Sequence, residues 1–423
     1  MDVFVQLTHL SSGAMAKVLL VTTNYWPEPT GIAIYTTDLA KSLTSKNHEV
    51  CVLTSLPHYP WWKVPEEFSE VTEGLESHFG NTILRVKHFI PTKMNALQRM
   101  RFEISLWWNL RKTAKKFVGK NIEVVIACIP TVASGIVGKL FAKKLQVPFG
   151  VVIQDLSGAG AKQSGLQGGV TISKIAHAVE GTVLRGADSI VVVSPVMIGV
   201  IAAYGVPTSR ITKIENYAAK KITSIDTTSA RTKFGWDLSD FIVIHTGNMG
   251  AKQDLENVVQ AAEILKDSSK IKIYLVGHGN QESKLKSLCR NMKNIFIIPA
   301  VSEEDYSALL SAADLLLVNE RITQIDMSLP SKLTSYMSSG KPVLASVPPR
   351  GATWKFLEGI AEFVEAGNPI ALAIKIEELS ENPKRLKELS DLGYKFAKEN
   401  LDAEIGRQKY LHWVNALLKM KSS

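Results

Sequence analysis

The chain has 423 residues, of which 45% are hydrophobic, and a formal net charge of +9. It is longer than a single compact core usually supports, so we expect two domains of about 200 residues each. Its three cysteines, Cys51, Cys128 and Cys289, lie far apart without the spacing of a metal site, in apolar or helical runs that suit small core residues, and they favour a reducing cytosol.

The N-terminal residues 1–14 lack the basic segment and the long apolar segment of a secretory signal peptide. The longest apolar run, residues 124–138, contains Pro130 and is shorter than a bilayer span. We therefore expect a cytoplasmic protein without a membrane-spanning helix.

Short, almost wholly apolar runs alternate with helical stretches along the chain. A first series occupies residues 18–21, 50–53, 83–86, 124–129, 150–153, 190–193 and 211–214, and a second occupies residues 241–244, 271–276, 295–298, 315–318, 343–345 and 363–364. Continuous apolar runs are typical of parallel strands that helices cover on both faces. The sequence therefore predicts an α/β protein of two doubly wound, Rossmann-like domains facing a cleft, the default place for a ligand.

A polar stretch at residues 223–237 separates the two series, and we expect the domain boundary near residues 216–224. The predicted domains are residues 15–218 and 219–400, followed by a C-terminal helix within residues 401–423.

The loop after the first strand, residues 23–32, enters a helix through Gly31. Glycine lets a ligand approach the backbone closely at a helix N-terminus, and a plain loop glycine is the alternative. The loop does not match G-x-G-x-x-G, so a dinucleotide fingerprint is absent.

Residues 99–120 contain seven basic residues and one acidic residue, Glu103, interleaved with large apolar side chains. A helix of this composition is suited to lie on an anionic membrane surface. The candidate contacts are Arg101, Trp107, Trp108, Arg111, Lys112 and Lys115. In the alternative, the apolar face packs on the helix's own domain and the lysines are solvated. We expect no nucleic-acid partner, because no helix-turn-helix, zinc-finger or RNP pattern accompanies the charge.

Glycine-rich loops follow two neighbouring strands of the second series. Gly247, Asn248 and Lys252 follow one strand, and Gly277 and Gly279 follow the next. Two glycines and a lysine before a helix suit a diphosphate, with the lysine as a point charge. The shared position of the loops strengthens the prediction of a phosphate site.

A further helix is expected to begin at Pro330 and to end at Gly340. Pro330 suits a first helical turn, and Ser331 and Lys332 would offer an amide, a hydroxyl and a positive charge to a phosphate. From these residues alone, an ordinary capped helix is the alternative.

Taken in order, these motifs resemble the GT-B glycosyltransferases of the GT4-like class, retaining enzymes that move a sugar from a nucleotide sugar. The resemblance extends from Lys17 to about Trp413 and is greatest to the subgroup of colanic-acid and exopolysaccharide biosynthesis glycosyltransferases. It is carried by Asn24-Tyr25-Trp26-Pro27-Glu28, Pro57-His58-Tyr59-Pro60, Gln154-Asp155-Leu156, residues 186–194, residues 247–253, Gly277-His278-Gly279, Ala312-Ala313-Asp314 and Leu329-Pro330-Ser331-Lys332-Leu333.

The resemblance implies a first domain on the acceptor side, a second domain that binds the nucleotide sugar, and a C-terminal helix that packs back toward the first. The implied catalytic residues are Asp155, Lys252 and Lys332, with Asp155 contacting the sugar or acceptor, or else capping a helix. The implied donor-binding residues are Gly31, Gly247, Asn248, Gly277, Gly279, Asp326, Ser331 and Ser335.

The chain departs from the family pattern at several of these positions. Two glutamates that many relatives carry correspond here to Met327 and Ser335, with Asp326 beside the first. The arginine that often precedes the diphosphate lysine is replaced by Asn248, and Arg321 is a candidate to supply the missing charge, with a solvated side chain as the alternative.

The implied activity is hexosyl transfer with retention from a nucleotide-diphosphate sugar to a lipid-linked exopolysaccharide acceptor, by a protein bound peripherally to the inner face of a membrane. No cofactor is expected, and no metal, because an Asp-x-Asp motif is absent. One alternative, suggested by the missing glutamates, is a non-catalytic, membrane-associated nucleotide-sugar-binding protein. Another is a sugar-nucleotide epimerase of the same fold, for which no convincing set of acidic and basic residues is present.

Overall fold

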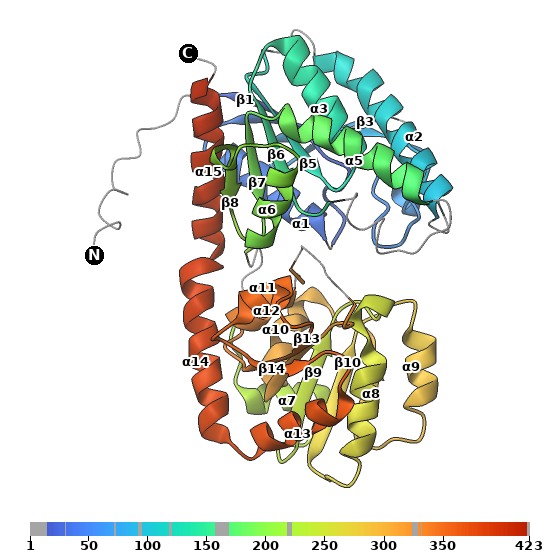
Figure 1. Ribbon diagram of the computed structural model, residues 1–423, viewed down its shortest axis with the longest axis vertical. Helices are drawn as coiled ribbons and strands as arrows, with labels where there is room; N and C mark the ends of the chain where they lie inside the picture. Colours follow the sequence, from blue (N-terminus) through green and yellow to red (C-terminus); the bar gives the residue numbers. More distant parts are fainter. Residues whose placement is uncertain are drawn as a thin grey trace, which may run out of the picture. The chain divides into compact units, whose positions relative to one another are not determined.

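The computed structural model of the chain describes residues 15–29, 31–71, 73–91, 95–117, 121–156, 169–217, 222–323, 329–330 and 332–420. The chain divides into two compact units, one of Met1–Glu215 with Arg407–Ser423 and one of Asn216–Gly406, and each is an α/β unit (Figure 1). The division after Glu215 lies at the edge of the expected boundary, residues 216–224.

The first unit contains an eight-stranded sheet in the order β3-β4-β2-β1-β5-β6-β7-β8. Its strands are β1 (Lys17–Val21), β2 (Glu49–Ser55), β3 (Glu73–His78), β4 (Asn81–Val86), β5 (Val124–Ile129), β6 (Phe149–Ile153), β7 (Ser189–Val192) and β8 (Ile211–Lys213). Its helices are α1 (Ile32–Ser45), α2 (Ala96–Ala114), α3 (Val132–Leu145), α5 (Gly169–Arg185), α6 (Pro195–Ala203) and α15 (Ala403–Met420), with 3-10 turns η1 (Glu66–Phe68), η2 (Lys115–Phe117) and η3 (Thr208–Arg210).

All strand pairs of this sheet are parallel except that β3 pairs antiparallel with β4. The sequence did not indicate β3, because Glu73–His78 is largely polar and its one large apolar residue, Leu75, is 72% exposed. A polar strand of this kind suits the edge of a sheet, where charged side chains discourage pairing with other chains.

Helices α3 and α15 cover opposite faces of the first sheet. A Cβ added to Gly138 of α3 would lie 2.9 Å from the ring of Phe149, whereas one added to Gly150 would lie 2.8 Å from the ring of Trp413 in α15. Successive residues on a strand point to opposite faces, so the two helices lie on opposite sides of β6.

The C-terminal helix is joined to the first unit by polar contacts as well. Trp413 Nε1 donates to Ser189 Oγ at 2.8 Å, and Arg407 donates to both carboxylate oxygens of Asp38 at 2.9 and 3.0 Å. The chain thus returns to the first unit within residues 401–423, where the C-terminal helix was expected.

The second unit contains a six-stranded, wholly parallel sheet in the order β11-β10-β9-β12-β13-β14. Its strands are β9 (Phe241–Thr246), β10 (Ile271–Val276), β11 (Ile295–Ile298), β12 (Leu315–Asn319), β13 (Val343–Val347) and β14 (Glu362–Glu365). Its helices are α7 (Thr227–Phe234), α8 (Leu255–Ile264), α9 (Glu282–Leu288), α10 (Glu303–Ala312), α11 (Lys332–Ser338), α12 (Ala352–Leu357), α13 (Pro369–Ser380) and α14 (Pro383–Asn400), with a 3-10 turn η4 (Ala251–Gln253).

Two apolar clusters cover the two faces of the second sheet. Val243 packs in a cluster with residues of α8 and α13, whereas its neighbours Ile242 and Ile244 pack with residues of α10 and α11. Both faces are therefore buried, which explains the uninterrupted apolar runs. The prediction of two doubly wound α/β domains is confirmed.

Candidate functional site

The carboxyl end of β9 brings Lys332, His245 and Gly247 together. Lys332 is half-buried at the start of α11, and its Nζ lies 3.0 Å from His245 Nε2. His245 is fully buried at the end of β9, and its Nδ1 lies 3.1 Å from the carbonyl oxygen of Leu317 in β12. A carbonyl only accepts, so Nδ1 carries the imidazole proton and Nε2 accepts from Lys332.

The ammonium of Lys332 lies against the backbone of the predicted phosphate loop. A Cβ added to Gly247 would lie 3.6 Å from Lys332 Cε and 3.7 Å from Nζ. Two residues predicted separately for the donor site, one after β9 and one at the start of α11, therefore occupy the same place.

Burial controls the charges of this pair. It lowers the pKa of Lys332 to about 7, and the nearby carboxylate of Glu320 opposes this shift. Burial, and then the charge of Lys332, lower the pKa of His245 well below its usual value, so the imidazole is neutral near pH 7. The Lys332 amine therefore changes its protonation state near pH 7, whereas His245 Nε2 stays a hydrogen-bond acceptor.

The loops after β9 and β10 are packed backbone to backbone. The amide of Gly247 donates to Val276 at 2.8 Å, and the amide of Met249 donates to His278 at 2.8 Å. A Cβ on Gly277 would lie 2.0 Å from the carbonyl oxygen of Gly247, and one on Gly279 would lie 2.4 Å from that of Met249. Contact between the loops therefore requires glycine at positions 277 and 279, which the resemblance implies to be donor-binding residues.

The turn that carries Lys252 is held by Asn319 at the end of β12. Asn319 Nδ2 donates to the carbonyls of Gln253 and Asp254 at 2.8 and 3.0 Å, and the amide of Arg321 donates to the carbonyl of Lys252 at 2.9 Å. The side chains of Lys252 and Arg321 are exposed on adjoining backbone. Arg321 thus lies where a second cation for the same loop was expected, with its guanidinium 4.0 Å from Asp254.

Ser335 lies in α11 beside a tyrosine network. Tyr306 interacts with both Ser335 and Thr246, and the Tyr336 hydroxyl accepts from the amide of Thr246 at 2.8 Å. Burial raises the pKa of both tyrosines. Where relatives often carry a glutamate, this chain therefore offers neutral hydroxyl groups. Of the other predicted donor residues, Asn248 is exposed, and Asp326 and Ser331 lie outside the described residues.

In the first unit, Glu28 joins two of the segments that carry the family resemblance, Asn24–Glu28 and Pro57–Pro60. Its buried carboxylate accepts from the amides of His58 and Tyr59 at 2.8 and 2.9 Å and from Asn24 Nδ2 at 2.7 Å. Gly31, at the entry to α1, has a φ of 65°, and a Cβ there would lie 3.3 Å from the Tyr59 ring. The loop of residues 23–32 and the Pro57–Pro60 segment are therefore held together as one structure.

Asp155 is exposed just after β6, and its Oδ1 accepts from the amide of Leu156 at 2.8 Å. Residues 157–168, which an N-cap would have to engage, lie outside the described residues.

Helix α2 has both a buried and an exposed apolar face. Phe102, Leu106 and Leu110 are buried, as the packing alternative required. A second set, called here the α2 stripe, recurs every three or four residues and is exposed by 57, 39, 55 and 59%: Leu97, Met100, Ile104 and Trp108.

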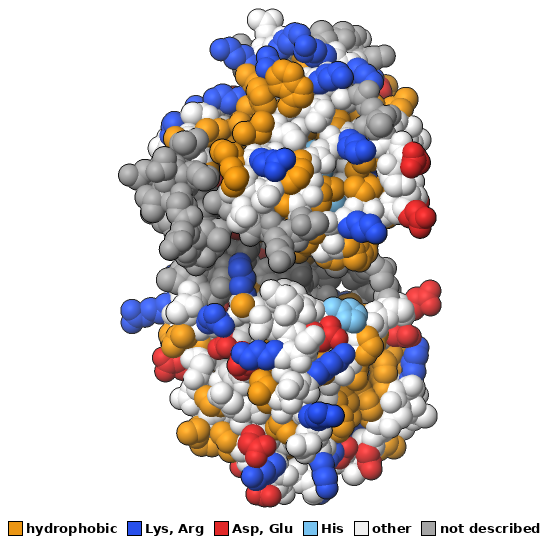
Figure 2. Space-filling model, turned by 90° about the vertical axis from the view of Figure 1, so that its right-hand side faces the viewer, with side chains coloured by type: hydrophobic (Ala, Val, Ile, Leu, Met, Phe, Trp, Pro, Cys, Tyr) orange, Lys and Arg blue, Asp and Glu red, His pale blue; other side chains and the backbone are white. Residues whose placement is uncertain are grey.

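Cations accompany the α2 stripe. Arg101, Arg111, Lys112 and Lys115 are exposed, whereas Trp107 is half-buried with Arg111 over its ring at 5.4 Å. On the face of the first unit that carries α2, basic side chains lie among hydrophobic ones (Figure 2). The predicted basic and aromatic residues therefore do form an exposed surface, with Trp107 at its margin.

In the described part of the chain, no group of three or more His, Cys, Asp or Glu side chains is placed to hold a metal ion. No helix there is long and apolar enough to cross a bilayer.

Sequence reasoning missed His245, Glu320 and Glu28 as site residues. A weak signal existed for His245, which ends an apolar strand directly before a glycine loop. Glu28 has no local signal of its own, because its partners His58 and Tyr59 are about thirty residues away in the sequence.

Solved structures of the same architecture identify the fold. Sucrose-phosphate synthase from Thermosynechococcus elongatus matches with a TM-score of 0.73 at 15% identity, over 96% of this chain and 100% of that chain. HepE of Anabaena in complex with UDP-glucose matches with a TM-score of 0.65 at 14% identity, over 95% and 99%. The fold is GT-B.

Sequence comparison gives the family. Residues 30–216 match the glycosyl transferase 4-like domain, and residues 226–396 match glycosyl transferases group 1. WcaI of Escherichia coli (strain K12), whose name describes a colanic acid biosynthesis glycosyl transferase, is 27% identical over an alignment of 404 positions that covers 92% of this chain and 97% of WcaI. The chain belongs to the GT4-like, group 1 glycosyltransferases, as the motifs predicted.

Proposed function

We propose that the protein transfers a hexosyl group from a nucleotide-diphosphate sugar to a lipid-linked exopolysaccharide acceptor, with retention of anomeric configuration. The observation that carries the proposal is the position of Lys332, whose ammonium lies against Gly247 at the carboxyl ends of the parallel strands. Ligands of open α/β sheets bind at that end of the strands. The structure of HepE with UDP-glucose and the name of WcaI support a nucleotide sugar and an exopolysaccharide acceptor.

The chemistry requires stabilisation of a leaving group. As the bond between the anomeric carbon and the phosphate oxygen breaks, negative charge develops on the diphosphate, and Lys332 and Lys252 would balance it without a metal. The acceptor hydroxyl would attack from the face that the phosphate leaves, and that phosphate would take the hydroxyl proton. No protein nucleophile is needed. Ser335 and Asp326 would contact the donor nucleoside.

The α2 stripe and its cations support peripheral binding to the inner face of a membrane. Exposed Trp and aliphatic side chains would enter the interface between lipid headgroups and acyl chains, while Arg101, Arg111, Lys112 and Lys115 would pair with anionic headgroups. Such binding would keep the protein beside a lipid-linked acceptor.

The test of transfer is incubation with a panel of radiolabelled nucleotide sugars, with and without membrane extract and with and without EDTA. We expect label in a lipid-extractable product from one donor, unaffected by EDTA. Lys332→Ala and Lys252→Ala should each weaken donor binding about tenfold or more, because a charge-assisted contact to phosphate is lost. Donor binding without transfer or hydrolysis would favour a non-catalytic binding protein. Unchanged donor affinity in both variants would contradict the proposed phosphate site.

The test of membrane binding is sedimentation with liposomes of phosphatidylcholine and phosphatidylglycerol. Trp108→Ala and Ile104→Ala should reduce the bound fraction at low salt, and added salt should reduce it further. Leu238→Ala is the matched control, because Leu238 is 56% exposed but lies in the second unit. Equal sedimentation of all variants would contradict a role for α2.

A further inference from the structure

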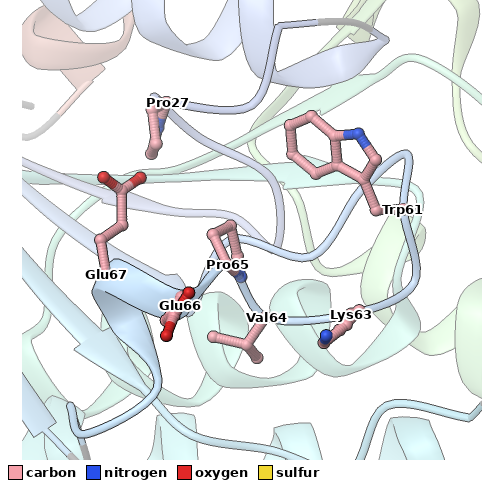
Figure 3. Close-up of a pocket in the computed structure, with 7 residues that line it drawn as sticks. All are labelled: Pro27, Trp61, Lys63, Val64, Pro65, Glu66 and Glu67. Atoms are coloured by element: carbon pink, nitrogen blue, oxygen red, sulfur yellow. The ribbon is translucent and has the colours of Figure 1, made fainter.

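The first unit has an open surface cavity of about 400 Å³ beside the loop that precedes α1. Trp61 and Glu67 lie on opposite sides of the hollow, with Pro27 and Pro65 between them (Figure 3). The lining residues are Pro27, Trp61, Lys63, Val64, Pro65, Glu66 and Glu67.

Hydrogen bonds to the backbone hold the segments that carry the lining residues. Pro27 and Trp61 belong to the two segments that the buried carboxylate of Glu28 ties together through the amides of His58 and Tyr59. On the other side, the amide of Phe68 donates to the carbonyl of Pro65 at 3.0 Å and closes the η1 turn. A ligand would therefore lose little affinity to ordering of the protein.

The lining combines an aromatic face with polar groups that have no partner. Trp61 is 57% exposed, although it borders a cavity with further apolar surface from Pro27 and Pro65. Among the described residues, the side chains of Lys63, Glu66 and Glu67 make no hydrogen bond or ion pair. An exposed aromatic side chain and an uncommitted carboxylate on opposite sides of the hollow are therefore available to a ligand that has both apolar and hydroxyl surfaces.

The charge of the lining selects against an anion. Two carboxylates, Glu66 and Glu67, stand against the single ammonium of Lys63, so a diphosphate would be repelled. A sugar ring has the required properties, because its C–H groups carry slight positive charge that the face of an indole attracts, and its hydroxyls donate to carboxylates.

We propose that this cavity is a sugar subsite, in which Trp61 stacks on a neutral pyranose ring of the acceptor glycan and Glu67 accepts hydrogen bonds from its hydroxyls. The assignment to the acceptor rests on the proposed function, whereas sugar binding itself does not. Glu28 acts as a positioning residue for the subsite, because it holds together the segments that carry Pro27 and Trp61.

The experiment is saturation-transfer NMR with the methyl glycosides of glucose, galactose, mannose and N-acetylglucosamine at millimolar concentration. At least one glycoside should bind the wild-type protein. Trp61→Ala should weaken that binding about three- to tenfold, the range of one aromatic contact, and Glu67→Gln should weaken it by a similar factor. Trp61→Phe, which keeps a smaller platform, should retain most of the affinity.

Phe79→Ala is the matched control, because Phe79 is an aromatic residue of the same unit that is 59% exposed and does not line the cavity. Its glycoside affinity should equal that of wild type, and urea unfolding should confirm that all four variants are folded. If no glycoside binds the wild-type protein, or if Trp61→Ala binds as wild type does, the subsite is wrong.

Turnover assays with lipid-linked acceptor separate this inference from the proposed function. Trp61→Ala should raise the acceptor KM and leave the donor KM unchanged. Glycoside binding could be lost in Trp61→Ala while the wild-type protein transfers sugar from no donor. That result would support the sugar subsite and refute the transferase proposal. A raised donor KM with an unchanged acceptor KM would overturn the acceptor assignment.

Discussion

Lys332 Nζ donates a hydrogen bond of 3.0 Å to Nε2 of His245, across 87 residues of sequence. The imidazole can only accept at that nitrogen, because its other nitrogen donates to Leu317. The pair therefore places an amine of lowered pKa against the backbone of Gly247 while leaving two of its protons for a ligand.

Donor binding should weaken as the pH rises above 7. The pKa of Lys332 is lowered to about 7, so the free protein loses its ammonium as the pH rises through that value, whereas a diphosphate binds the protonated form. The donor dissociation constant should rise by up to about tenfold per pH unit between pH 7 and 9. His245 stays neutral over this range, and Glu320 is the acidic group that partly supports the charge. Titration calorimetry at several pH values measures the effect.

Lys332→Arg is the control for this pH dependence. A guanidinium stays protonated over the whole range, so the variant should bind donor with an affinity that hardly changes between pH 7 and 9. A wild-type affinity that is flat over the same range would show that Lys332 is not the group that meets the phosphate.

His245 should act as a positioning residue for Lys332. His245→Phe fills the buried space but removes the acceptor, so the Lys332 side chain is no longer fixed at Gly247. We expect the donor KM to rise about three- to tenfold, the net value of a typical hydrogen bond, with a smaller change in kcat. His245→Gln, which restores an acceptor oxygen, should recover part of the affinity. Failure of Gln to recover more than Phe would point to a purely structural role.

The strands could be predicted from the sequence, but the pairing of Lys332 with His245 could not. The buried strands are uninterrupted apolar runs, and such runs are visible in a single sequence, whereas β3 is polar because it lies at an edge and so left no signal. Gly247 and Lys332 were each predicted from local chemistry. Their meeting, and the role of His245, depend on how β9 packs beside α11, which no local pattern records.

The same limit applies to Gly277, whose environment the sequence could not supply. A loop glycine is consistent with the close approach of either a ligand or another loop, and in the structure the backbone of Gly247 lies where a Cβ of Gly277 would be. Side-chain properties can be inferred from residue type, whereas the identity of a neighbouring loop requires the assembled sheet.

Gly277→Ala should destabilise the second unit strongly. Its φ of 146° is unfavourable for a residue with a side chain, and the added Cβ would lie 2.0 Å from a carbonyl oxygen. We expect a loss of about 3 kcal/mol or more in the free energy of unfolding, measured in urea. Gly359→Ala is the matched control, with a φ of 82° and no atom within 4 Å of the new Cβ, and should cost only about 1 kcal/mol. Similar losses in the two variants would mean that the contact between the loops is looser than the structure shows.

Glu28 should determine both the stability of the first unit and the rigidity of its cavity. Glu28→Ala leaves the amides of His58 and Tyr59 without their acceptor in a buried place, so we expect a loss of about 2–4 kcal/mol in the free energy of unfolding. Glu28→Gln keeps one acceptor oxygen for these amides and should cost less.

The two Glu28 variants also test whether the tie between the loops serves the cavity. Glu28→Gln should bind methyl glycosides nearly as wild type does, because both amides remain bound and Trp61 keeps its place. Glu28→Ala, measured at a urea concentration and temperature where it is folded, should bind them more weakly, although Glu28 does not line the cavity. Wild-type glycoside affinity in folded Glu28→Ala would show that the position of Trp61 does not depend on this carboxylate.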